Sequence, residues 1–150
     1  MKELLKLAAV DEEDLAVISA HVQDAVLKVG DMVYQPRQQR FALAMNRFGW
    51  ECEGGEKRFY ERRRAALVFD RVRNVRVSGI DRSESEAVLE LLAVRFVPGA
   101  LPEGTVELCF AGGGGLRMDV ECIEARLADL GEAWPTPHKP HHAVADSPTT

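Results

Sequence analysis

The sequence predicts an α+β fold, with a mainly antiparallel sheet curled into a barrel of the pleckstrin-homology type. Three observations lead to this prediction. Helical spacing of apolar residues occurs in two windows, one near the N-terminus and one near residues 120–130. Between them apolar and polar residues alternate with a period of two, and glycine, proline and polar clusters interrupt the alternation at short intervals. A flatter α+β sheet carrying both helices on one face is the alternative.

The first elements are a short strand and a helix. Residues 5–9 alternate weakly and indicate the strand. Asp11 is a suitable N-cap, and the acids that follow it suit the first turn of a helix, where the dipole favours negative charge. The spacing of four apolar residues then predicts a helix over 12–25, with one buried stripe: Leu15, Ile18, Val22 and Ala25.

The middle of the chain predicts strands of period two. Residues 32–34 and 41–45 alternate on either side of a turn at 35–38. Residues 47–57 contain three glycines and predict a loop or an irregular strand end. Residues 62–80 predict two strand runs separated by a bend near 70–74.

The next strand and the last unit follow a polar loop at 81–86. Residues 88–97 are almost continuously apolar, which predicts a central strand covered on both faces. Residues 106–110 and 116–120 predict a β-hairpin across a four-glycine connection. Helical spacing then predicts a C-terminal capping helix that ends before Gly131, with the stripe Val120, Ile123, Leu127 and Leu130.

The composition divides the chain into one domain and a tail. Residues 1–134 have the length and apolar content of a single α+β domain. Residues 135–150 hold four of the seven prolines and three of the four histidines, and they have almost no large apolar side chains. Such a segment cannot offset its ordering entropy by burial, so we expect a disordered tail with incidental histidines rather than a metal site.

Three segments resemble a family of small uncharacterised bacterial proteins, known as a domain of unknown function. They are the ending Gly115 to Trp134, the segment Phe69-Asp70-Arg71-Val72 and the strand Leu91 to Phe96. The resemblance covers roughly residues 3–135 and implies a single bacterial cytoplasmic domain. It supplies no catalytic residues.

The number and spacing of the cysteines and the length of the apolar runs indicate the cellular compartment of the protein. The three cysteines, Cys52, Cys109 and Cys122, are odd in number and have no CxxC spacing, which argues against a disulfide framework or a zinc ribbon. No apolar run approaches the roughly 18 residues of a membrane span, and acids from Asp11 onward interrupt the N-terminus before a secretory apolar region forms. We therefore expect a reduced, cytoplasmic protein that does not bind membranes.

Positive charge is concentrated in one stretch of an acidic chain. The net charge is −5, yet residues 57–82 hold nine basic residues and three acidic ones. This local basic face could attract an anionic ligand or a protein partner, whereas the bland alternative is a solvated sheet face paired with acids. The candidate contact residues are Arg62, Arg64, Arg71, Arg73 and Arg76, together with Trp50 between glycine-rich segments.

No nucleophile, base or metal set stands out in the sequence, and no cofactor is predicted. The favoured interpretation is therefore a non-enzymatic binding or adaptor module. The acidic balance argues against nucleic acid, and edge strands of a small β-rich domain allow a homodimer. The alternative is a small-molecule-binding protein or enzyme with a pocket in the curled sheet. That would require two or more chemical side chains to converge: His21, Asp70, Arg71, Arg73, Glu107 and Asp119.

Overall fold

The computed structural model describes residues 4–53, 56–131 and 134–135. The described chain contains one α-helix, eleven strands and three short 3₁₀ turns. In chain order the elements are β1 (Lys6–Ala9), α1 (Glu12–Val22), β2 (Val26–Lys28), η1 (Val29–Asp31), β3 (Met32–Gln35), η2 (Pro36–Gln38), β4 (Arg40–Glu53), β5 (Glu56–Phe69), β6 (Val72–Ser78), β7 (Val88–Pro98), β8 (Gly104–Phe110), η3 (Ala111–Gly113), β9 (Gly115–Val120), β10 (Ala125–Asp129) and β11 (Trp134–Pro135).

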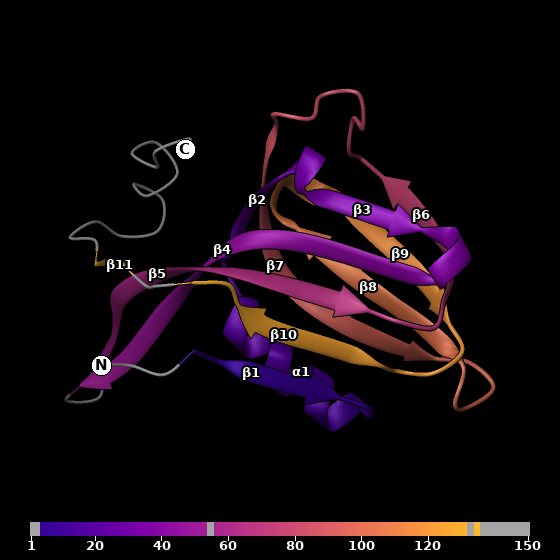
Figure 1. Ribbon diagram of the computed structural model, residues 1–150, viewed down its shortest axis with the longest axis horizontal. Helices are drawn as coiled ribbons and strands as arrows, with labels where there is room; N and C mark the ends of the chain where they lie inside the picture. Colours follow the sequence, from indigo (N-terminus) through magenta and orange to yellow (C-terminus); the bar gives the residue numbers. More distant parts are fainter. Residues whose placement is uncertain (1–3, 54–55, 132–133, 136–150) are drawn as a thin grey trace.

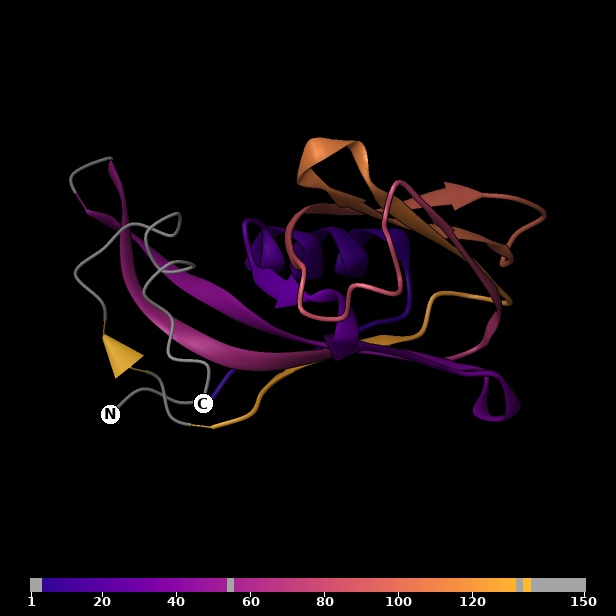
Figure 2. The same ribbon diagram turned by 90° about the horizontal axis from the view of Figure 1, so that it is seen from above.

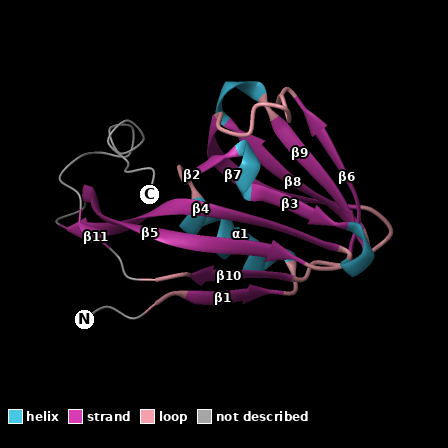
Figure 3. Ribbon diagram, turned by 45° about the horizontal axis from the view of Figure 1, so that its top comes forward, coloured by secondary structure: helices cyan, strands magenta, loops and turns pink. Residues whose placement is uncertain are grey.

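The strands form one strongly curved sheet that does not close on itself. Their order is β1-β10-β5-β4-β2-β7-β8-β9-β6, with β3 paired to β4 and β11 paired to β5. All these pairings are antiparallel. The short strand β2 joins two layers, one built around the long β4–β5 hairpin and one built from β7, β8, β9 and β6 (Figures 1 and 3).

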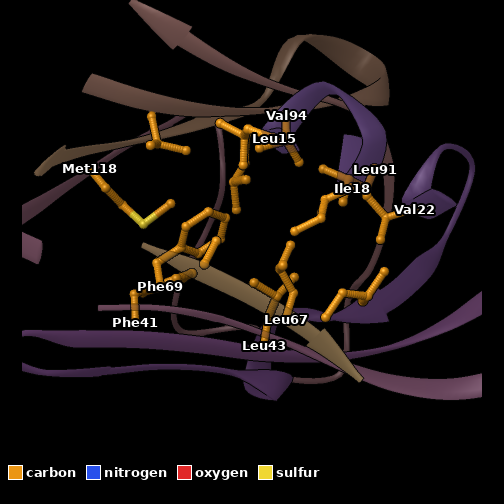
Figure 4. Close-up of a cluster of buried hydrophobic side chains, with 14 of the residues drawn as sticks. Leu15, Ile18, Val22, Phe41, Leu43, Leu67, Phe69, Leu91, Val94 and Met118 are labelled. Atoms are coloured by element: carbon orange, nitrogen blue, oxygen red, sulfur yellow. The ribbon is translucent and has the colours of Figure 1, made fainter. Parts of the chain in front are cut away.

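The hydrophobic core lies between the two layers and α1 (Figure 4). The helix contributes one buried stripe, Leu15, Ile18 and Val22, which is the spacing that a helix needs to bury a single face. Alternate residues of the strands point into the same space, with Leu43 from β4 and Leu67 from β5 fully buried. Burial of these side chains is the main force that holds the layers together.

Two side-chain hydrogen bonds connect segments that do not pair directly as strands. In the first, α1 lies against β7, and the backbone N–H of Val94 donates to Ser19 Oγ at 2.9 Å. In the second, the Tyr34 hydroxyl of β3 donates to the carbonyl of Arg73 on β6 at 2.9 Å. The sheet therefore resembles an incomplete barrel, with α1 held against β7 and the edge strand β6 held to β3.

The elements predicted for the first half of the chain are largely confirmed. Asp11 caps α1 by accepting from the Asp14 N–H at 2.7 Å. The helix ends at Val22 rather than residue 25, because Asp24 adopts a left-handed conformation with φ 68. The predicted hairpin around residues 35–38 is β3–η2–β4. For residues 47–57 the sequence predicts a loop or an irregular strand end, and the second alternative fits: β4 continues to Glu53, β5 begins at Glu56, and their register shifts between Gly49 and Trp50.

The predicted C-terminal helix is wrong. Residues 125–129 form β10, which pairs with both β1 and β5. Ala125, Leu127 and Asp129 are buried, while Arg126 is exposed, so the burial has the period of a strand. The helical stripe combined Val120 at the end of β9 with residues of a loop and of β10. The α+β class holds, but without a helix at this position and with an open sheet, the pleckstrin-homology-like barrel is not confirmed.

The prediction for residues 88–97 needs a second correction. These residues form β7, but only one face of the strand is covered: Val88, Leu92 and Val97 are exposed on the other face. The hairpin predicted between residues 106 and 120 is confirmed as β8–β9. Its connection requires glycine, because Gly112 and Gly113 have φ of 87 and 93.

Among the described residues, no helix is long and apolar enough to cross a membrane. The predicted tail falls almost entirely on residues 136–150, which lie outside the described chain.

Candidate functional site

The arginines singled out in the sequence lie in two separate groups. Arg71 precedes β6, and Arg73 and Arg76 belong to β6, an edge strand of the sheet. Arg62 and Arg64 belong to β5 in the other layer. The structure therefore does not bring the five arginines into one surface.

Acidic residues from other segments form ion pairs with the arginines of the β6 group. Arg71 Nε lies 3.4 Å from Glu124 Oε1, and Arg73 Nη2 lies 3.0 Å from Glu103 Oε2. Arg76 Nη2 lies 3.0 Å from Asp119 Oδ1 on the neighbouring strand. The hydrogen bond from Arg71 raises its own pKa above the usual range, helped by the negative charge of Glu124. The positive charge of this stretch is thus shared with acids that lie far from it in the sequence.

The β5 group is different in burial. Arg62 is buried, and its backbone lies opposite Trp134 of β11. Arg64 is half-buried on the outer face of the layer, 3.7 Å from Asp31 Oδ1, and its Nη1 donates to Asn46 Oδ1 at 3.4 Å. The side chain of Trp50 lies outside the described part of the structure. Its backbone pairs with Phe59 next to a register shift in the β4–β5 hairpin.

The residues required for an enzymatic reading have separate partners. His21 Nδ1 contacts the carbonyl of Val17 within α1 at 2.9 Å. Glu107 lies 3.0 Å from Arg117 on the β8–β9 surface. Asp70 binds two arginines, Arg40 at 2.8 Å and Arg126 at 3.2 Å. The contacts of Asp70 and Glu107 join neighbouring segments of the sheet, and none of the three contacts brings two of these side chains together.

Arg47, Arg63 and Asp129 form a buried charge cluster that the sequence analysis did not predict. Asp129 of β10 accepts two hydrogen bonds from Arg47 at 2.8 Å each and one from the Leu5 N–H at 2.9 Å. Arg63 lies 3.7 Å from the same carboxylate. Burial alone would raise the pKa of Asp129, but the hydrogen bonds and the charges of Arg47 and Arg63 outweigh burial and lower it.

The outer face of the β10–β5–β4–β3 layer carries an exposed apolar surface, which we call the apolar belt. Its members are the outward-facing small and branched residues of four neighbouring strands. The registers place them side by side: Val33 opposite Ala42, Ala42 opposite Val68, Ala44 opposite Ala66, and Ala66 opposite Ala128. Leu130, the residue after β10, extends the belt. The belt is therefore Val33, Ala42, Ala44, Ala66, Val68, Ala128 and Leu130.

No described helix or strand covers the belt. Figure 2 shows α1 and the β7–β9 layer together on one side of the β4–β5 layer. Leu43 and Leu67 of this layer are buried in the core on that side, so the belt residues that alternate with them face the opposite side. The two ends of the belt are the most exposed, with Val33 at 51% and Leu130 at 55% of their full exposure. The five belt residues between them are half-buried in the outer face of the sheet. An outward apolar surface with a polar border is typical of a protein–protein interaction site.

Cationic groups border the belt on both sides. On one side Arg40 and Arg126 share the single carboxylate of Asp70. On the other side Arg64 adjoins the belt with Asp31 as its acidic neighbour. Of the arginines predicted as contacts, Arg64 is therefore the one that borders this surface.

The sequence of β4 contains one signal for the belt. Arg40, Ala42, Ala44 and Asn46 share one face of this strand, opposite the face of Phe41, Leu43 and Met45. Alanine at two of these positions is unusual for a solvated strand face. The signal becomes a surface only when the register sets β4 beside β5 and β10, and sequence periodicity does not give that register.

Comparisons with known proteins give a family without an activity. Residues 5–142 match the family model described as Protein of unknown function (DUF2948). This match confirms the resemblance to a domain of unknown function that the sequence predicts over residues 3–135. No curated protein and no solved structure matches the chain.

Proposed function

The chain belongs to the DUF2948 family of proteins of unknown function, and we propose that it is a non-enzymatic module that binds another protein through the apolar belt. The observation that carries the proposal is an outward apolar sheet surface, exposed at its two ends and half-buried between them, beside paired arginines. Removing such apolar surface from water, by binding a partner, is favourable by roughly 25 cal/mol per Å² of apolar area buried.

The geometry of the rest of the described chain is consistent with this role. The chemical side chains considered for catalysis have separate structural partners, as Asp70 has in Arg40 and Arg126. The β6 arginines also have acidic partners, so they offer an anionic ligand less free charge than the sequence count implies. A partner that combines apolar and polar contacts fits the belt better than a small anion.

A pair of matched substitutions tests the proposal. Ala66→Glu places a charge at the centre of the belt, whereas Ala93→Glu places the same charge on the outer face of the β7–β8 layer. Both alanines are half-buried strand residues. Each variant, tagged at the N-terminus, is expressed in the host of the protein, and native mass spectrometry identifies what copurifies.

We expect wild type and Ala93→Glu to retain the same second polypeptide and Ala66→Glu to lose it. Circular dichroism and thermal melting establish that both variants are folded. If Ala66→Glu does not fold, Val33→Glu at the exposed end of the belt replaces it. Retention of the polypeptide by a folded belt variant would disprove the assignment of the surface. A retained small molecule of a few hundred daltons without a polypeptide would favour the pocket alternative instead.

A further inference from the structure

We infer that the partner segment bound by the belt is an amphipathic α-helix with acidic residues along both sides of its apolar stripe. This inference rests on the proposed function and adds the chemistry of the partner. Three features of the belt carry it: its dimensions, the size of its side chains and the charge on its two sides.

The dimensions of the belt match one helix. The belt runs diagonally from Leu130 beside β5 to Val33 on β3, across four neighbouring strands and over three rows of outward residues. Beyond Leu130, β1 pairs with β10, and the exposed Leu4 that precedes β1 adds apolar surface at this end. With a strand spacing of about 4.8 Å and about 6.8 Å between rows on one face, the diagonal is about 20 Å long. At 1.5 Å per residue, this is the length of a helix of about 13 residues.

The width of the belt points to the same occupant. Along β4 only Ala42 and Ala44 separate the charged Arg40 from the polar Asn46. The apolar surface is therefore about two side-chain rows wide, which one helix of about 10 Å diameter covers. A second sheet packed face to face would extend beyond the belt and bury the arginines on its sides against apolar atoms, at a large desolvation cost.

The side chains of the belt allow a close approach. Four of its seven members are alanines, Val68 lies opposite Ala42 on β5, and the larger Val33 and Leu130 stand at the two exposed ends. This arrangement leaves a shallow surface with raised ends, into which the leucine-sized side chains of a helix stripe can pack at i, i+3, i+4 and i+7.

The charge on both sides selects an acidic helix. Arg40 and Arg126 share one carboxylate on one side, and Arg64 lies on the other side with Asp31 as a more distant neighbour, at 3.7 Å. Glutamates that flank the apolar stripe would meet guanidinium groups on both sides. The same cations disfavour a second copy of this chain, because face-to-face stacking would place arginines over arginines.

Selection from a displayed library of helical peptides tests the inference. The library holds 18-residue amphipathic helices with a fixed leucine and alanine stripe, and the flanking positions are randomised among Glu, Lys and Ser. Selection is carried out on the wild type, and binding of the enriched peptides is measured on Ala66→Glu, on Ala93→Glu and on the double variant Arg64→Glu/Arg126→Glu.

We expect the enriched flanks to be rich in glutamate. Binding should fall at least tenfold on Ala66→Glu and on the double arginine variant, and it should remain unchanged on Ala93→Glu. Enrichment of lysine, no enrichment, or binding that is equal on all variants would overturn the inference. Self-association of the wild type that Ala66→Glu abolishes would overturn it as well.

The failure of the inference and of the proposed function are distinguishable. If the copurified polypeptide depends on Ala66 while the helical library yields no belt-dependent peptide, the belt binds a protein by another kind of segment. If neither the polypeptide nor any peptide depends on Ala66, the proposed function fails too.

Discussion

Asp129 is the residue on which the buried charge cluster depends. Its side chain is fully buried and binds Arg47 through both carboxylate oxygens. Asp129→Asn would leave the guanidinium of Arg47 buried without an opposite charge, and breaking such a pair costs about 3–5 kcal/mol. We expect a loss of this size in the free energy of unfolding from urea denaturation. Glu124→Gln is the control, since the pair of Glu124 with Arg71 is exposed and should contribute under about 1 kcal/mol.

The same cluster predicts a loss of stability in acid. Because folding lowers the pKa of Asp129 below its unfolded value of about 3.9, the folded state binds this proton more weakly than the unfolded state does. The stabilisation is present above pH 4 and is lost as the pH falls through the folded pKa. Asp129→Asn should therefore show less loss of unfolding free energy than the wild type between pH 5 and 2. Parallel curves for the two proteins would contradict this.

The pKa of Glu90 is shifted in the opposite direction from that of Asp129. Burial raises the pKa of this carboxyl, and the neighbouring negative charge of Asp24 raises it further. The charged form is thus disfavoured in the folded protein, so stability is highest below the unfolded pKa and decreases as the pH rises through the folded pKa. Glu90→Gln should raise the free energy of unfolding at pH 7 by a few tenths of a kcal/mol, because the group is largely exposed. The gain should vanish at pH 3, and a gain that persists there would show another cause.

At the scale of elements, the β7–β8 hairpin depends on a glycine. A Cβ atom at Gly104 would lie 2.7 Å from the Val97 carbonyl oxygen and would overlap the ring of Phe96. Gly104→Ala must therefore displace the ring or the strand, and we expect about 1–3 kcal/mol of destabilisation in thermal or urea unfolding. Gly115→Ala on β9 is the matched control, because its Cβ would meet only the Leu108 carbonyl at 3.5 Å. Equal losses for the two variants would refute the steric explanation.

The same scale shows which elements the sequence could predict. The N-terminal helix and the β3–β4 and β8–β9 hairpins have local signals, namely an N-cap, strict alternation and turn residues, and these predictions are confirmed. β10 has no such signal. Its residues are mostly good helix formers. After Ala125 and Leu127, the third buried residue of the strand is Asp129, and the polarity of an aspartate predicts exposure to solvent rather than burial. Pairing with β1 and β5 overrides the local propensity.

At the scale of the molecule, the candidate site was harder to predict than the fold. The sequence predicts contact residues in a run of arginines, because local charge density can be counted along the chain. The structure separates these arginines and pairs Arg73 with Glu103, which lies 30 residues away. The apolar belt combines residues of four strands, each of which contributes one or two apolar side chains. Such a surface depends on register between distant segments, which a single sequence does not give.

The incomplete barrel predicts independent contributions from two side-chain hydrogen bonds. Ser19→Ala leaves the Val94 N–H without its partner, at a cost of about 1–3 kcal/mol, and Tyr34→Phe removes the bond to Arg73 O, at about 0.5–1.5 kcal/mol. One bond joins α1 to β7 and the other joins β3 to β6, and they share no residue, so the losses should add in the double variant. Urea unfolding of both single variants and the double variant measures this. A double loss clearly smaller or larger than the combined single losses would show instead that the two bonds break together, as one cooperative unit.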